Sequence, residues 1–288
     1  MTALITGATG FLGVHIIEEL LSKGFEVIAV VRPGSAKLAV LSGLPIEIIE
    51  LGLSEINRIT QIVPSVDYFL HLAWEGTTAA GRDDENTQKH SAEAAIEAAR
   101  TAIALGAKAF VFAGSQAEYG LRQQYGRYKL LAGDSCTEAL KGTPTRFIRL
   151  KIFSLYGIGD QNNSVISAGV RKLSANEDFD LTACEQLWDF LHVSDAAEAI
   201  YALLESGGGE YDISYGEPKP LKEFILRMKE ISGSKSLLNF GAIPYPAGGP
   251  VSLSPDITNL VRDTNWSPKI TFEQGIKELF KAGLHYGR

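Results

Sequence analysis

Three glycines spaced three residues apart follow a short apolar run near the start of the printed sequence. The run covers residues 2–5, and the glycines are Gly7, Gly10 and Gly13. Where a buried strand turns into a helix, this spacing provides a tight turn, room for a phosphate group and close packing of the helix against the strand. The first helical turn also directs unpaired amide groups and a partial positive charge toward an anion. This pattern predicts a nucleotide-binding turn between a strand and a helix.

Apolar runs alternate with helical patterns over the first half of the chain. Helical spacing covers residues 11–23, and Gly24 stands where that helix would end. We expect strands at residues 2–5, 25–31, 46–51, 68–73, 107–113 and 145–150, and further helices at residues 54–63, 86–105 and 125–140. Strands that are apolar on both faces are typical of parallel sheets covered by helices. The sequence therefore predicts an α/β fold with a doubly wound, Rossmann-like parallel sheet.

The alternation changes near Tyr156, where glycines and short segments become frequent. We interpret residues 1–155 plus about 187–207 as the Rossmann domain. Residues 156–186 and 208–288 would then form a smaller α+β lobe. Residues 194–204 have a helical pattern that begins at a capping Ser194, and we expect this helix to pack on the sheet.

Charge and composition exclude several classes of protein. The formal net charge is −7 and basic residues do not cluster, so we expect no nucleic-acid partner. No apolar run approaches the roughly eighteen residues of a membrane helix, and no cationic leader precedes the first strand. Cys136 and Cys184 lack the spacing of metal ligands, so we expect no metal site. These features favour a cytoplasmic protein with no membrane partner.

A candidate catalytic group follows the run at residues 107–113. Ser115 stands at the end of this predicted strand, and Tyr125 and Lys129 are four residues apart, so they share one face of a helix. A nearby cation favours the phenolate form of a tyrosine, and a phenol beside an ammonium group is a usable acid. Ser115 could hold a substrate oxygen beside that phenol. We therefore predict that Ser115, Tyr125 and Lys129 are catalytic.

Several motifs occur in the same order as in one known family. They are residues 6–13, 71–74, Ser115 with 119–120, Tyr125 with Lys129, 155–157, 189–195 and 265–268. In these the chain resembles the extended short-chain dehydrogenase/reductases of the NAD-dependent epimerase/dehydratase type, which act on nucleotide-diphosphate sugars. Residues 114–120 and 71–76 look most like the small 4-ketoreductases similar to CDP-abequose synthase.

The resemblance implies a role for each candidate residue. Ser115 would hydrogen-bond the reacting sugar oxygen, Tyr125 would pass the proton, and Lys129 would bind the nicotinamide ribose. The implied cofactor-binding residues are Gly7, Thr9, Gly10, Phe11, Leu12, Gly13, Leu72, Ala73, Lys129 and Ile152. The implied substrate-binding residues are Trp74, Gln116 and Ser154. The implied partner is a nucleotide-diphosphate sugar bound partly by the smaller lobe, and family members often form homodimers.

The end of the second predicted strand indicates which cofactor is used. Arg32 stands where an acidic residue usually binds the ribose of NAD, and an arginine can pair with a 2′-phosphate instead. Arg32, with Ser35, therefore favours NADP(H), while NAD(H) remains possible. NADP suits a reductase, so we expect NADP-dependent reduction of a nucleotide-diphosphate 4-keto-6-deoxyhexose.

Two alternatives remain open from the sequence. One is an NAD-dependent 4-epimerase. A dehydratase is not among them, because Gln116 and Ala117 stand where that chemistry needs an acidic pair. The other is a non-catalytic, NADP-sensing binding protein. Ser115 and Tyr125 are only ten residues apart, and Trp188 and Pro246 stand where arginines are usual, which keeps this alternative open.

Overall fold

The computed structural model describes residues 1–160, 164–245 and 249–283, and the chain divides into two compact units. The first unit comprises Met1–Ile152, Ala197–Ile213 and Thr258–Trp266. The second unit comprises Phe153–Ala196, Ser214–Ile257 and Ser267–Arg288. Pro246 lies outside the described residues.

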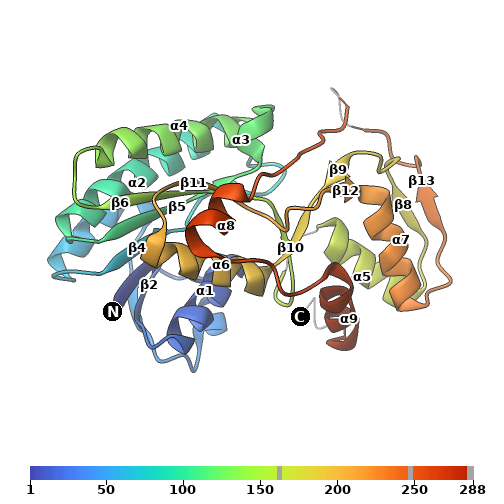
Figure 1. Ribbon diagram of the computed structural model, residues 1–288, viewed down its shortest axis with the longest axis horizontal. Coiled ribbons are helices and arrows are strands. Elements are labelled where there is room, and N and C mark those ends of the chain that lie inside the picture. The colour runs from blue at the N-terminus through green and yellow to red at the C-terminus, as the bar shows by residue number, and fades with distance from the viewer. Residues whose placement is uncertain (161–163, 246–248, 284–288) are drawn as a thin grey trace. The chain divides into compact units, whose positions relative to one another are not determined.

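A seven-stranded sheet forms the centre of the first unit (Figure 1). Its strands are β1 (Thr2–Thr6), β2 (Glu26–Val31), β3 (Glu47–Glu50), β4 (Tyr68–His71), β5 (Ala109–Ser115), β6 (Arg146–Ile152) and β11 (Gly209–Ile213). Their spatial order is β11-β6-β5-β4-β1-β2-β3, and every neighbouring pair is parallel. The predicted Rossmann-like parallel sheet is confirmed.

Helices cover both faces of this sheet. On one face α2 (Glu85–Ala104), α4 (Gln124–Leu140) and the 3₁₀ helix η2 (Leu53–Gln61) pack on apolar strand residues such as Phe69, Phe110 and Phe112. Small residues make this packing close, because Ala95, Ala98, Ala99 and Ala102 of α2 are fully buried. On the other face α1 (Phe11–Ser22) buries Ile16, Ile17 and Leu20. Figure 1 shows α1 and α2 on opposite sides of the sheet.

The second unit is a small α+β structure, as expected. Three pairs of short strands are present: β7 (Ser154–Tyr156) with β10 (Phe190–His192), β8 (Phe179–Leu181) with β13 (Leu238–Phe240), and β9 (Leu187–Trp188) with β12 (Lys219–Pro220). They pack with α5 (Val165–Ala175), α7 (Leu221–Ser232) and α9 (Phe272–Lys281). The aromatic rings of Tyr156, Phe190, Phe224 and Phe272 contact one another in its core.

The structure corrects several predicted boundaries. We placed residues 208–288 in the smaller lobe, but β11 pairs with β6 in the main sheet, and α8 (Thr258–Thr264) belongs to the first unit. We placed residues 187–196 in the Rossmann domain, but they belong to the second unit. The predicted helix at residues 54–63 is the 3₁₀ helix η2, and α6 (Val193–Ser206) begins before Ser194. Charged Glu210 and Asp212 interrupt the apolar pattern of β11, which explains why this strand was missed.

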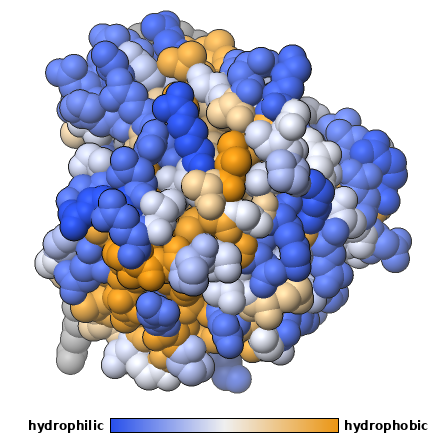
Figure 2. All heavy atoms as spheres, turned by 90° about the vertical axis from the view of Figure 1, so that its left-hand side faces the viewer, coloured by the Kyte–Doolittle hydropathy of each residue, from blue (hydrophilic) through white to orange (hydrophobic). Residues whose placement is uncertain are grey.

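The first unit also exposes apolar side chains. Its exposed large hydrophobic residues include Ile48 of β3, Leu131 of α4, and Ile62, which follows η2. Figure 2 shows one area in which hydrophobic residues gather, with hydrophilic residues around it. Exposed apolar area of this kind often marks a surface that binds another protein. Across the described ranges, no helix combines the length and apolarity needed to cross a membrane.

Replacing Gly13 by Ala should destabilise the first unit. Alanine inside a helix is usually favoured over glycine by about 1 kcal/mol. At Gly13, however, the added methyl group would clash with the carbonyl oxygen of Gly7, and we expect a net loss of about 2 kcal/mol. Urea unfolding of Gly13→Ala measures this loss, and Gly208→Ala, where nothing lies near the added methyl, is the matched control. Equal unfolding midpoints for the two variants would show that the turn has room for a side chain.

Candidate active site

The glycine-rich turn between β1 and α1 has the geometry that the sequence predicted. Gly7 has a φ of 72°, and a Cβ atom there would lie 2.7 Å from the amide nitrogen of Ala73. The amide of Gly10 donates to the carbonyl of Gly7 at 2.9 Å, and α1 then begins at Phe11 with no side-chain cap. The first amides of α1 are therefore available to an anion, and a nucleotide phosphate group fits this turn.

The other predicted cofactor residues gather at the same edge of the sheet. Thr9, Phe11 and Leu12 are partly exposed at the turn. The amide of Leu72 donates to the carbonyl of Thr6, and the amide of Ala73 donates to the Thr6 hydroxyl, each at 3.3 Å. Exposed Arg32 and partly exposed Ser35 follow β2, and Ile152 ends β6. All of these residues lie at the carboxyl ends of parallel strands, where α/β proteins usually bind ligands.

Ser115 and Tyr125 are brought together despite their short separation in the sequence. Helix α3 (Ala117–Gly120) and a left-handed Leu121 with a φ of 47° turn the chain back toward α4. The Ser115 side chain lies near enough to the Tyr125 phenol to lower the pKa of that phenol. The Ser115 hydroxyl also accepts a hydrogen bond from the amide of Ala117 at 3.2 Å. A separation of ten residues is therefore enough to bring Ser115 and Tyr125 near each other, and no longer connecting segment is needed.

Lys129 lies beside this pair on α4 and is almost fully buried. Its ammonium group donates to the carbonyl of Ala113 and lies 4.0 Å from the ring centre of Trp74 and 5.8 Å from that of Tyr125. Burial lowers the pKa of Lys129 to about 7, while the negative charge of Glu118 acts in the opposite direction. Lys129 is therefore close to losing its charge at neutral pH.

We expected the Lys129 cation to favour the phenolate form of Tyr125, but the pKa of Tyr125 is raised. Burial raises the pKa of the Tyr125 phenol, and the Ser115 side chain and the charge of Arg82 lower it only in part. The Arg82 guanidinium lies 5.0 Å from the centre of the Tyr125 ring, and the Tyr125 amide donates to the Arg82 carbonyl at 2.8 Å. The cation that favours the phenolate is therefore Arg82, and Tyr125 remains a protonated phenol at neutral pH.

Two of the three predicted substrate residues lie near the pair. The Trp74 ring meets that of Tyr125 edge to face, with 6.2 Å between their centres, and its indole nitrogen donates to Gln88 at 2.7 Å. The amide of Gln116 donates to the carbonyl of Ile152 at 3.0 Å. Ser154 belongs to the second unit, where Trp188 donates to its hydroxyl at 2.8 Å.

Three residues of this site were missed from the sequence. Arg82 lies in a polar segment without a motif, and only its charge could have drawn attention to it. Gln88 is fully buried and binds the carbonyls of Gly76 and Gly81, which fixes the segment that carries Trp74. Glu118 directs its carboxylate to the backbone of Ser115. The one available signal for Glu118 was its charge, since it stands among small and polar residues after β5.

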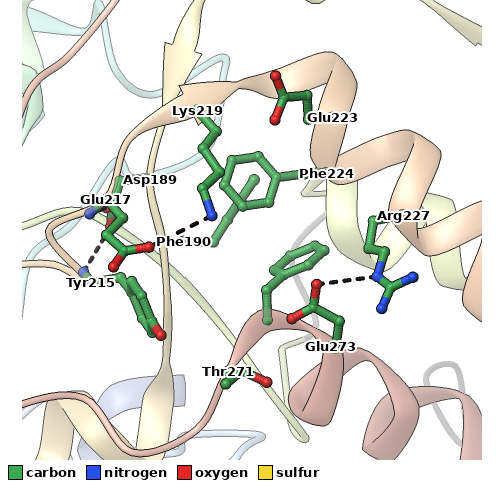
Figure 3. Close-up of a pocket in the computed structure, with 11 residues that line it drawn as sticks. Asp189, Phe190, Tyr215, Glu217, Lys219, Glu223, Phe224, Arg227, Thr271 and Glu273 are labelled. Carbon is green, nitrogen blue, oxygen red and sulfur yellow. Dashed lines mark hydrogen bonds and ion pairs between the residues drawn. The ribbon is translucent and has the colours of Figure 1, made fainter.

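A separate cavity of about 300 Å³ lies in the second unit (Figure 3). Four of its charged lining residues form two ion pairs: Lys219 with Glu217 at 3.6 Å, and Arg227 with Glu273 at 3.1 Å. None of its lining residues is a predicted site residue. Within the described part of the chain, no cluster of three or more His, Cys, Asp or Glu side chains could hold a metal ion.

Comparison with known proteins identifies the family. Residues 3–214 match the NAD dependent epimerase/dehydratase family. The chain belongs to this family. It is thus an NAD(P)-dependent enzyme, which confirms the family and the enzyme class that the sequence motifs indicated.

Individual members of this epimerase/dehydratase family are similar over most of the chain. CDP-abequose synthase from Salmonella muenchen is 26% identical over an alignment of 290 residues that covers 96% of each chain. The dTDP-6-deoxy-L-talose 4-dehydrogenase (NAD(+)) of Aggregatibacter actinomycetemcomitans is 27% identical over 247 residues, which cover 78% of this chain and 88% of that protein. The solved UDP-glucose 4-epimerase of Thermotoga maritima, with UDP-glucose, shares the fold at a TM-score of 0.88 and 22% identity, with 99% of this chain and 100% of that chain covered.

Replacing Lys129 by Met should change how stability depends on pH. The pKa of Lys129 is about 7 in the folded protein against an ordinary value of 10.5, so between these pH values the unfolded chain binds more protons. The free energy of unfolding of the unaltered protein, relative to that of Lys129→Met, should therefore rise with pH above about 7, by at most about 1.4 kcal/mol per pH unit. Urea unfolding of both proteins without cofactor measures this difference. A difference that is constant from about pH 7 to about pH 9 would contradict the lowered pKa.

Proposed function

We propose that the enzyme reduces the 4-keto group of a nucleotide-diphosphate 4-keto-6-deoxyhexose with NADPH. The observation that carries this proposal is that Ser115, at the end of β5, acts on the Tyr125 phenol, and that the buried Lys129 lies 5.8 Å from the centre of the Tyr125 ring. The similarity to CDP-abequose synthase along 96% of both chains supports a nucleotide sugar as the substrate. Trp74 and Gln116 are proposed to contact that substrate, and a contact from Ser154 stays a prediction of the sequence.

The side chains have the chemistry that carbonyl reduction requires. A bound nicotinamide cofactor supplies the hydride in this family of reactions. The Tyr125 phenol transfers its proton to the carbonyl oxygen, which becomes the new hydroxyl group. The Ser115 hydroxyl donates a hydrogen bond to the same oxygen, and Lys129 binds the ribose hydroxyls of the cofactor. The raised pKa of Tyr125 keeps the phenol protonated, as a proton donor needs.

The preference for NADP is proposed from the end of β2. The exposed Arg32 follows Val31, and the amide of Ser35 donates to the Arg32 carbonyl at 3.2 Å, so both residues belong to one short turn. A guanidinium group and a hydroxyl group can together bind a 2′-phosphate. The glycine turn and the uncapped start of α1 are proposed to bind the diphosphate of the same cofactor.

An NAD-dependent 4-epimerase is the second candidate, because the same serine and tyrosine could remove the proton of a sugar hydroxyl and return it, while a bound NAD would supply the redox chemistry. Likeness to the solved 4-epimerases supports a shared fold for this candidate. We do not retain the binding-protein alternative, since the chain belongs to an enzyme family. A homodimer formed through α2 and α4 stays a prediction; Leu131 of α4 is exposed. A cytoplasmic location also stays a prediction.

Replacing Tyr125 by Phe should lower kcat by at least about a hundredfold, because the variant lacks the phenol that transfers a proton to the carbonyl oxygen. The affinity for NADPH should stay nearly unchanged, since the phenol acts in the reaction and not in cofactor binding. Consumption of NADPH with CDP-, GDP-, UDP- and dTDP-linked 4-keto-6-deoxyhexoses measures activity, and fluorescence titration measures affinity. Full activity of the variant would refute the role of Tyr125.

The same panel, extended by the corresponding nucleotide-linked 4-hydroxy sugars with NAD, separates the two candidate enzymes. A reductase consumes one NADPH for each keto group that it reduces. An epimerase interconverts two sugars with no net change in the cofactor, and then the proposed reduction would be wrong.

Replacing Arg32 by Asp should move the cofactor preference from NADP toward NAD. The substitution removes the cation that would pair with the 2′-phosphate and adds an acceptor for ribose hydroxyl groups. We expect the ratio of the two dissociation constants to change by about tenfold or more. Titration of both cofactors into both proteins measures this ratio. An unchanged ratio would show that Arg32 does not reach the cofactor.

A further inference from the structure

A buried ion pair lies behind the catalytic serine. Glu118 of α3 and Arg149 of β6 are both buried, and a carboxylate oxygen of Glu118 accepts from Arg149 at 2.8 Å. The other carboxylate oxygen accepts from the backbone amide of Ser115 at 2.7 Å. Both oxygens of Glu118 therefore have a donor, and the carboxylate can rotate only by losing one of them.

The surroundings of the pair are built to hold it. A Cβ atom at Gly114 would clash with the Glu118 carboxylate, and one at Gly133 would clash with the Arg149 guanidinium. Arg149 also donates to the carboxylate of Asp134 at 2.7 Å and to the carbonyl of Leu130 at 3.2 Å. The pair thus joins β5, β6, α3 and α4 at the end of the sheet where Ser115 and Tyr125 lie.

We infer that Glu118, fixed by Arg149, is a positioning residue that holds Ser115 in place against Tyr125. Its catalytic consequence rests on the proposed function, in which Ser115 and Tyr125 act on one carbonyl oxygen. Displacement of a catalytic group by about 1 Å can cost a large factor in rate, so a fixed backbone amide at Ser115 matters for turnover. A buried ion pair often adds little to the stability of the fold. The contact between Glu118 and the Ser115 amide indicates that this pair positions the serine instead.

The pair also sets the charge around Lys129. The charged or titratable groups that face Glu118 or Lys129 are Arg149 of β6, Tyr119 of α3, His71 of β4, and Tyr125 beside Lys129 on α4. Glu118 is the anion that opposes the lowering of the Lys129 pKa by burial. Burial and the charge of Lys129 lower the pKa of His71 to about 3, so His71 stays neutral. Loss of the Glu118 charge should therefore make Lys129 lose its proton at a lower pH.

Glu118→Gln tests the inference, with Asp134→Asn as the matched control. Arg149 and the Ser115 amide are both donors, and a glutamine has only one oxygen to offer them. Asp134→Asn removes the same charge from another partner of Arg149, but Asp134 is 62% exposed and has no contact with Ser115. We expect kcat of Glu118→Gln to fall about tenfold or more, and kcat of Asp134→Asn to change by less than about twofold. The alkaline limb of the pH–rate profile should move to lower pH only in Glu118→Gln. Equal kcat values and equal profiles for the two variants would overturn the inference.

A double variant keeps the test decisive if Glu118→Gln does not fold. In Glu118→Gln with Arg149→Met, the glutamine oxygen can accept from the Ser115 amide alone, and neither position of the former ion pair keeps an unpaired charge. We expect kcat to recover toward that of the unaltered enzyme, with the alkaline limb still at lower pH. A profile identical to that of the unaltered enzyme would overturn the role of the Glu118 charge.

A separate readout distinguishes this inference from the proposed reaction. If the unaltered enzyme reduces none of the 4-keto sugars, the proposed function is wrong, and the affinities for NADPH and NADH are measured against pH instead. Loss of affinity at a lower pH in Glu118→Gln but not in Asp134→Asn would still support the inference. The same pH dependence in both variants would overturn it.

Discussion

The candidate site depends on the parallel pairing of β1, β2, β4, β5 and β6. Parallel pairing brings the carboxyl ends of these strands to one edge, with Thr6 opposite His71 and Ser115 opposite Ile152. Each strand end adds one part: the glycine turn after β1, Arg32 after β2, Trp74 after β4 and Ser115 at the end of β5. Residues far apart in the sequence therefore meet with little dependence on loop conformation.

Burial of charge is the main energetic cost at this edge. A lowering of the Lys129 pKa from 10.5 to about 7 corresponds to about 5 kcal/mol against the charged form, several times the contribution of an ordinary hydrogen bond. The opposing effect of the Glu118 carboxylate is already part of this net value, and the ring of Trp74 and the carbonyl of Ala113 contact the ammonium group directly. Glu118 is itself held by Arg149, so Lys129 and Ser115 both interact with the same buried carboxylate.

The sequence predicted those parts of the structure that follow from local patterns. The glycine spacing, the apolar strands, and the four-residue separation of Tyr125 and Lys129 each depend on short-range geometry, and the structure has all three. Strand β11 was missed because its charged residues hide a pairing with β6 that is distant in sequence. Arg82 and Glu118 were missed because the path of a turn decides which side chain reaches Tyr125 or Ser115, and the residue types do not encode that path.

The ionisation of Tyr125 decides whether the free site holds a proton donor or a proton acceptor. An epimerase first needs tyrosine to take a proton from a sugar hydroxyl, so it needs the phenolate, whereas a reductase needs the phenol. Burial raises the pKa of Tyr125, and Glu118 raises it further, while Ser115 and Arg82 act in the opposite direction. The net effect favours the phenol. The buried carboxylate that binds the Ser115 amide therefore also disfavours the phenolate, so one side chain acts on both the serine and the tyrosine.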